Sequence, residues 1–153
     1  MSSNGQLRSI QVFNRHRAPS TDVKLTLPAR PENVAVVRHV LGAFAQALGL
    51  PMELIEDIRL AITEACTNVV RHAYADSDPG SVEVSIRPHE DVVQVTVADH
   101  GCGIGTSADA SGPGLGLPLI AAVADTMELQ PVPGGGAQVR MTFVRRSALG
   151  DAA

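Results

Sequence analysis

Alternating apolar and polar positions mark several short segments of the chain. This alternation predicts strands over residues 23–27, 81–87, 92–99 and 137–144, and a further strand is expected over residues 127–132. In the longer segments, one face is rich in aliphatic side chains and the other face stays polar. Such a pattern is typical of a sheet that packs on a core with one side and leaves the other side open.

Helical spacing replaces alternation in three longer segments. Residues 31–49 place apolar side chains one turn apart, with a proline at the start and Gly49 as a C-terminal cap. Pro51 opens a second helix that is expected to run to about Tyr74, and residues 115–127 predict a third. The order of elements indicates an α/β two-layer sandwich, in which about three helices cover one face of a mixed, mainly antiparallel sheet.

The two ends of the chain are polar and show no period. We expect a loose N-terminal arm over residues 1–22, one domain over 23–145 and a frayed tail over 146–153. A chain of 153 residues is long enough for one sizeable core. Its 44% hydrophobic and 18% charged residues are typical of a globular protein.

Charge and composition narrow the classes of partner. The net charge of −4 argues against a general nucleic-acid or anionic-membrane binder. No apolar run approaches the roughly 20 residues that span a bilayer, and residues 1–17 lack the apolar centre of a signal peptide. With only two cysteines, a reduced, cytoplasmic protein is the simplest interpretation.

The second helix carries a polar row beside its buried side. Glu64, Asn68 and His72 are spaced four apart, which puts them close to one line on an α-helix, at the border of the aliphatic arc. A carboxylate and an amide are hard-oxygen groups suited to Mg²⁺ and to a water or hydroxyl. Considered alone, a solvated helix shoulder with chance spacing explains the row equally well.

A zinc site is an alternative for part of this row. The candidate ligands are Cys66, His72, His100 and Cys102. Their spacing is irregular, and helical geometry puts Cys66 on the other side of the helix from His72, so we disfavour zinc.

Asp99 ends the strand over residues 92–99 on its inward face. A carboxylate there needs a partner, either a backbone amide of the following turn or a ligand donor such as the exocyclic amine of adenine. A glycine-rich loop follows, and glycines let the backbone pass close to a ligand. The last of them, Gly116, opens the third helix, whose free N–H groups suit an anion.

Three ordered motifs resemble those of a known superfamily. The segment E-A-C-T-N-V-V-R-H-A-Y resembles the N box of the histidine-kinase-like ATPases, which have the Bergerat, or GHKL, fold. D-H-G-C-G-I resembles their G1 box and G-P-G-L-G-L their G2 box. The chain is most similar to the anti-sigma-factor serine kinases (RsbW-like). These bind a sigma factor and use ATP to phosphorylate a serine of an anti-anti-sigma factor in bacterial partner switching.

The resemblance implies a role for each matching residue. Glu64 would be the general base, Asn68 the Mg²⁺ ligand and Asp99 the acid that recognises adenine. Further contacts to ATP are implied at His72, Ala73, Gly101, Gly103, Ile104, Gly114, Leu115 and Gly116. Arg38 matches an arginine that contacts the protein partner, and the family implies a homodimer. For His72, a helix-end histidine bonded to backbone remains an equal alternative.

Two departures from the family pattern keep a second function open. The segment between the G1 and G2 boxes, Ile104 to Ser111, contains no Lys or Arg, although phosphoryl transfer depends on positive charge near the phosphates. Gly136-Ala137 replaces a family Gly-Thr and so lacks a hydroxyl near the adenine. The alternative is a non-catalytic module that binds ATP in order to sequester a protein. Glu64 favours the kinase, because a pure binder needs no base.

Overall fold

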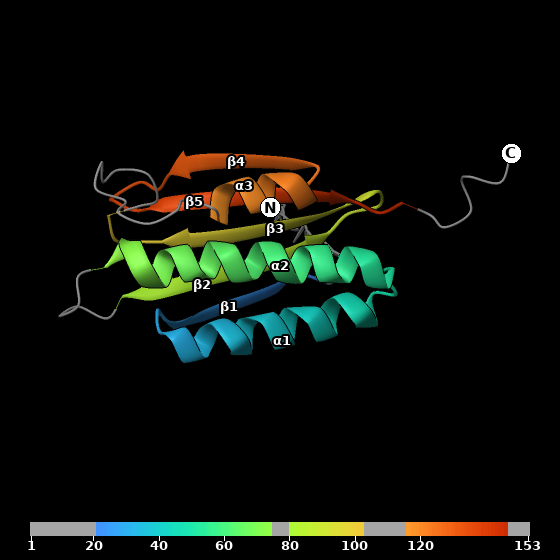
Figure 1. Ribbon diagram of the computed structural model, residues 1–153, viewed down its shortest axis with the longest axis horizontal. Coiled ribbons are helices and arrows are strands. Elements are labelled where there is room, and N and C mark those ends of the chain that lie inside the picture. The colour runs from blue at the N-terminus through green and yellow to red at the C-terminus, as the bar shows by residue number, and fades with distance from the viewer. Residues whose placement is uncertain (1–20, 75–79, 103–115, 147–153) are drawn as a thin grey trace, which may run out of the picture.

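A computed structural model describes residues 21–74, 80–102 and 116–146 of the chain. In this part of the chain, three helices cover one face of a five-stranded sheet, as Figure 1 shows. The predicted α/β two-layer sandwich is therefore confirmed. None of the helices within these ranges is both long and apolar enough to cross a bilayer.

The elements follow the predicted order. They are β1 (Val23–Pro28), α1 (Pro31–Ala47), α2 (Met52–Asn68), the π-helical turn η1 (Val69–Ala73), β2 (Ser81–Pro88), β3 (Val92–Asp99), α3 (Gly116–Val123), β4 (Thr126–Pro131) and β5 (Ala137–Val144).

The strands lie in the order β1-β2-β3-β5-β4, and all four pairings among the described strands are antiparallel. β3 is the central strand. Its last residue, Asp99, lies opposite Val82 at the start of β2, and Ala98 lies opposite Gln138 near the start of β5. The end of β3 is therefore flanked by the first residues of both neighbouring strands.

The aliphatic face of the sheet forms the core. The inward residues of β2, β3 and β5 are at most 2% exposed: Val82, Val84, Ile86, Val93, Val95, Val97, Val139, Met141 and Phe143. Burial of this aliphatic surface is the main stabilising contribution to the fold. The predicted alternation is confirmed in all three strands.

Helix α2 lies between α1 and α3 and contacts both. Its buried side is therefore wider than the aliphatic arc alone. Ala61 and Cys66, which lie outside the aliphatic arc, are both fully buried. One flank of α2 faces α1 and the other faces α3, so the polar residues on these two flanks lie in different environments.

One predicted helix end is confirmed and one is wrong. The second helix continues to Ala73, next to the expected end at Tyr74, although its α-helical geometry ends at Asn68 and a π-helical turn forms its last residues. The carbonyl of Ala73 accepts a hydrogen bond from Cys102 N–H at 2.8 Å, so the turn after β3 holds this end. The third helix ends at Val123 rather than at residue 127, because pairing with β5 makes the next residues a strand.

The end of α1 is confirmed. Gly49 follows the helix with φ of +71°, a left-handed conformation that favours glycine. Its N–H donates to the carbonyl of Gln46 at 2.9 Å, which satisfies one of the carbonyls left unpaired at a helix end.

Candidate functional site

Asp99 is fully buried at the end of β3. Its Oδ1 accepts a hydrogen bond from Gly101 N–H at 3.0 Å. Its Oδ2 is buried without a hydrogen-bond partner among the described residues. A buried acceptor that loses water and gains no donor is costly, so Oδ2 is an acceptor that a ligand can satisfy. The sequence offered a backbone amide of the turn as one possible partner of Asp99. This amide, Gly101 N–H, bonds to only one of the two carboxylate oxygens.

The turn after β3 packs closely on η1, at the end of α2. A Cβ added at Gly101 would overlap the carbonyl oxygen of Ala73 and lie 3.0 Å from the ring of Tyr74. Ala73 is 1% exposed. Asp99, Gly101 and Ala73, which the sequence assigned to one site, therefore lie together in the structure.

Gly136, which the family resemblance places near the adenine, also contacts this turn, and the sequence did not reveal that contact. It has φ of +99°, and a Cβ there would overlap the backbone carbonyl of Asp99. Only a glycine fits this position without a shift of the backbone. The available signal was the run of three glycines, residues 134–136, directly before the strand that pairs with β3.

Glu64 and Asn68 converge on the first residue of α3. A Cβ added at Gly116 would lie 2.9 Å from Asn68 Nδ2 and 3.3 Å from Glu64 Oε2. Both side chains are half-buried. They lie on the flank of α2 that faces α3. The first N–H groups of a helix have no acceptor within the helix, so this end of α3 suits an anion. The predicted row is confirmed for these two residues.

His72 does not continue this row as an α-helix would. It lies in the π-helical turn and is exposed, so the one-turn spacing from Asn68 no longer applies. Its contact with a nucleotide stays a prediction. Four other predicted site residues lie outside the described residues, namely Gly103, Ile104, Gly114 and Leu115, as does the segment over 104–111.

The two cysteines differ in environment. Burial raises the pKa of the Cys66 thiol to about 12, whereas Cys102 is exposed. Within the described ranges, no group of three or more His, Cys, Asp or Glu side chains could hold a metal ion. The zinc alternative therefore gains no support. A single amide oxygen from Asn68 fits Mg²⁺, which proteins commonly hold by few side chains together with phosphates and water.

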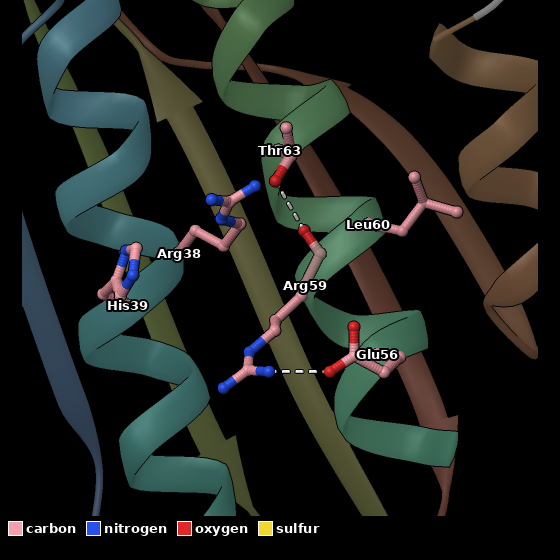
Figure 2. Close-up of a pocket in the computed structure, with 6 residues that line it drawn as sticks. All are labelled: Arg38, His39, Glu56, Arg59, Leu60 and Thr63. Carbon is pink, nitrogen blue, oxygen red and sulfur yellow. Dashed lines mark hydrogen bonds and ion pairs between the residues drawn. The ribbon is translucent and has the colours of Figure 1, made fainter. Parts of the chain in front are cut away.

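A separate cavity of about 370 Å³ lies between α1 and α2, on the flank away from α3 (Figure 2). It is lined by Arg38, His39, Glu56, Arg59, Leu60 and Thr63.

Two arginines of this cavity differ in their contacts. Arg59 forms an ion pair with Glu56 at 2.6 Å and lies over Gly42 of α1, where a Cβ would overlap its guanidinium. Arg38 is exposed, and no ion pair links it to a described residue. Arg38 is therefore a cation that a partner could bind without first breaking a contact.

Sequence comparisons agree with this geometry. The family of histidine kinase-like ATPase domains matches residues 27–143. The serine-protein kinase RsbW of Bacillus pumilus is 36% identical over 143 residues, with 81% of this chain and 86% of the relative covered. That of Halalkalibacterium halodurans is 37% identical over 131 residues, covering 76% and 79% of the two chains. RsbW of Bacillus velezensis is 43% identical over 79 residues, and there the match spans only about half of each protein, 52% of this chain and 49% of the relative.

Solved structures share the fold. The RsbU and RsbW domains of a Mycobacterium tuberculosis protein match with a TM-score of 0.67 and 26% identity, over 86% of this chain and 35% of that chain. The SiaB–SiaC complex of Pseudomonas aeruginosa matches with a TM-score of 0.55 and 16% identity, over 80% and 89% of the chains, which shows the fold alone. The chain therefore belongs to the histidine kinase-like ATPase domain family and, within it, to the RsbW-like serine-protein kinases.

Proposed function

We propose that this protein is an ATP-dependent protein-serine kinase that phosphorylates an anti-anti-sigma factor and also binds a sigma factor. The observation that carries the proposal is the buried Asp99 carboxylate, with one oxygen bonded to Gly101 and the other without a hydrogen-bond partner among the described residues. The exocyclic amine of adenine is a donor that suits this second oxygen. Relatives named serine-protein kinases support the same activity.

The candidate site has an adenine end and a phosphate end. Asp99 and the closely packed turn at Gly101 form the adenine end. Glu64, Asn68 and the first residue of α3 form the phosphate end, where backbone N–H groups favour negative charge. Asn68 would hold Mg²⁺, which supplies positive charge to the phosphates when it is bound. Because these residues come from different elements, the fold sets the distance between the two ends.

Glu64 is the candidate general base. Its half-buried carboxylate points at the same place as the amide of Asn68, so a serine hydroxyl next to the terminal phosphate would be within its reach. There the carboxylate would accept the hydroxyl proton as the oxygen attacks. Both residues come from one rigid helix, which holds them in a fixed relation.

The rival function is a module that binds ATP and a protein without catalysis. The absence of Lys and Arg from residues 104–111 favours it, because fewer cations would stabilise the transferred charge. Incubation with γ-labelled ATP and a cognate anti-anti-sigma factor separates the two functions. Phosphoserine on the substrate supports the kinase. Tight binding of ATP without transfer supports the rival.

We further propose that partners dock where α1 and α2 meet at the surface, at the cavity that Arg38 lines. Arg38 offers an exposed cation there, and Leu60 of α2, which lines the same cavity, is 37% exposed. An acidic and partly apolar surface of a partner would complement them. Capture of bound proteins in the presence and absence of ATP tests this surface.

We also expect a homodimer, from the family, and a location in the cytoplasm. Light scattering of the purified protein measures its molecular mass and so tests the homodimer. Cell fractionation tests the location of the protein.

A further inference from the structure

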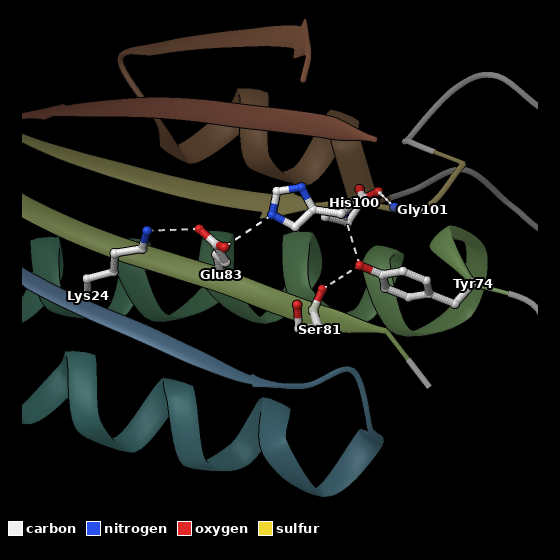
Figure 3. A network of polar contacts seen from close by, with 7 residues as sticks. Lys24, Tyr74, Ser81, Glu83, His100 and Gly101 are labelled. Atoms are coloured by element: carbon white, nitrogen blue, oxygen red, sulfur yellow. Dashed lines mark hydrogen bonds and ion pairs between the residues drawn. The ribbon is translucent and has the colours of Figure 1, made fainter. Parts of the chain in front are cut away.

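Tyr74, the single tyrosine of the chain, links three segments around the proposed adenine site at Asp99 (Figure 3). It follows η1 directly. Its hydroxyl donates to the carbonyl of Ser81 at 2.6 Å and accepts a hydrogen bond from His100 N–H at 2.9 Å. One side chain thus connects the end of η1, the start of β2 and the turn that follows β3.

Two glycines leave room for the ring of Tyr74. A Cβ added at Gly80 would overlap the ring, and one at Gly101 would lie 3.0 Å from it. Gly80 precedes β2, whose residue Val82 lies opposite Asp99, and Gly101 follows Asp99 by two residues. The ring therefore fills the space between the two backbone segments that approach Asp99.

We propose that Tyr74 is a positioning residue for adenine recognition. This inference rests on the proposed binding of ATP. Asp99 Oδ1 is fixed by Gly101 N–H, and the intervening peptide N–H of His100 is fixed by the Tyr74 hydroxyl. Because both backbone amides of the turn are held, the orientation of the Asp99 carboxylate is fixed, and so is the direction in which Oδ2 can accept a hydrogen bond.

The opposite side of the turn is held as well. His100 Nε2 lies 3.1 Å from Glu83 Oε1, and Lys24 Nζ lies 3.0 Å from Glu83 Oε2. Hydrogen bonds from Lys24 and His100 lower the pKa of Glu83, so this carboxylate stays charged. These contacts are partly exposed, whereas the Tyr74 hydroxyl bonds directly to the backbone next to Asp99. Tyr74 is therefore the contact whose loss should most affect the aim of Asp99.

The variant Tyr74→Phe keeps the ring and removes only the hydroxyl. Adenine presents an amine where guanine presents a carbonyl oxygen, so the ratio of ATP to GTP affinity reports how well Asp99 is aimed. We expect this ratio to fall about three- to tenfold in Tyr74→Phe, while the affinity for magnesium triphosphate stays unchanged. A merely structural role would weaken all three ligands alike. Thr142→Val is the matched control, because it removes a hydroxyl bonded to Thr126 at the other side of the sheet.

A second measurement uses the wild-type sequence. Because Tyr74 is the only tyrosine, fluorotyrosine labelling gives a single fluorine NMR signal from this ring. We expect the signal to shift when ATP saturates the protein and to stay in place with magnesium triphosphate. An unchanged ATP to GTP ratio in folded Tyr74→Phe, or an unmoved signal with ATP bound, would overturn the role of Tyr74 alone. A wild-type protein that binds no ATP would overturn the proposed function along with it.

Discussion

Asp99 accepts a hydrogen bond from Gly101 N–H through Oδ1, and its other oxygen is buried without a partner in the described part of the chain. The first contact forms the turn that the glycine permits. The second oxygen is left for a donor that the described residues do not supply. A buried acceptor without a hydrogen bond destabilises the fold by about 1–3 kcal/mol, and by more if it is charged. A ligand that donates a hydrogen bond to this oxygen removes that penalty, which favours binding. This relationship links the fold to the choice of nucleotide.

Replacing Asp99 by Asn should weaken ATP binding. The neutral amide loses a charge-assisted hydrogen bond of about 1.5–3 kcal/mol, so the dissociation constant should rise about tenfold or more. Isothermal titration calorimetry measures this constant directly. Asp22→Asn is the matched control, because Asp22 pairs with Arg87 at the start of β1 and should not affect ATP. Wild-type affinity in a folded Asp99→Asn protein would show that Asp99 does not recognise adenine.

Replacing Asn68 by Ala should remove the dependence of ATP affinity on Mg²⁺. Only the amide oxygen of Asn68 is assigned to the metal, and the alanine leaves α2 intact. ATP titrations with magnesium and with a chelator give the comparison. Gln46→Ala, which removes an exposed amide from α1, should keep the magnesium response. A folded Asn68→Ala protein that still responds like wild type would refute the ligand assignment.

Replacing Arg38 by Ala should weaken the binding of the protein partner about tenfold and leave ATP affinity unchanged. Arg38 is exposed on α1 and makes no ion pair with a described residue, so its removal should not disturb the fold. Surface plasmon resonance against the identified partner measures the effect. Arg87→Ala removes an exposed arginine from β2 as a control. Equal loss in both variants would indicate a general charge effect rather than a contact at Arg38.

The two cysteines should react with iodoacetamide at very different rates. Burial raises the pKa of Cys66 to about 12, so almost no thiolate exists at neutral pH, and the folded protein shields the sulfur. Cys102 is exposed and should be the residue that is modified. Peptide mass spectrometry after brief labelling gives the site. In denaturant both should react, which confirms that burial is the cause. Rapid native labelling of Cys66 would contradict the packing of α2.

The sequence predicted those features that depend on local periodicity. Alternation alone placed Asp99 on the inward face of β3, and helical spacing brought Glu64 and Asn68 to one flank of α2. These predictions hold because a strand or a straight helix fixes the direction of each side chain. The motifs then indicated the family.

Other features depend on contacts between distant segments. The π-helical turn at the end of α2 is joined to the turn after β3 by the bond between Cys102 and Ala73, which no local pattern encodes. The early end of α3 follows from pairing of β4 with β5. Tyr74 and Gly136 acquire their places only through the tertiary fold. Single residues without a periodic partner are for this reason the hardest to assign from sequence.

The central claim is that Glu64 acts as the base of a protein-serine kinase. The variant Glu64→Gln keeps the size of the side chain and removes the proton acceptor. We predict that serine phosphorylation of the cognate anti-anti-sigma factor falls about 10²–10⁴-fold, which is the usual effect of losing a general base. ATP affinity should change little, because Asp99 and Asn68 remain.

The decisive measurement is a time course of phosphoserine formation for wild type and Glu64→Gln, beside an ATP titration of each. A large loss of rate at constant ATP affinity is the predicted result. Equal rates in the two proteins would contradict the base assignment. Absence of phosphoserine in the wild type, with ATP tightly bound and the cognate substrate present, would contradict the kinase itself.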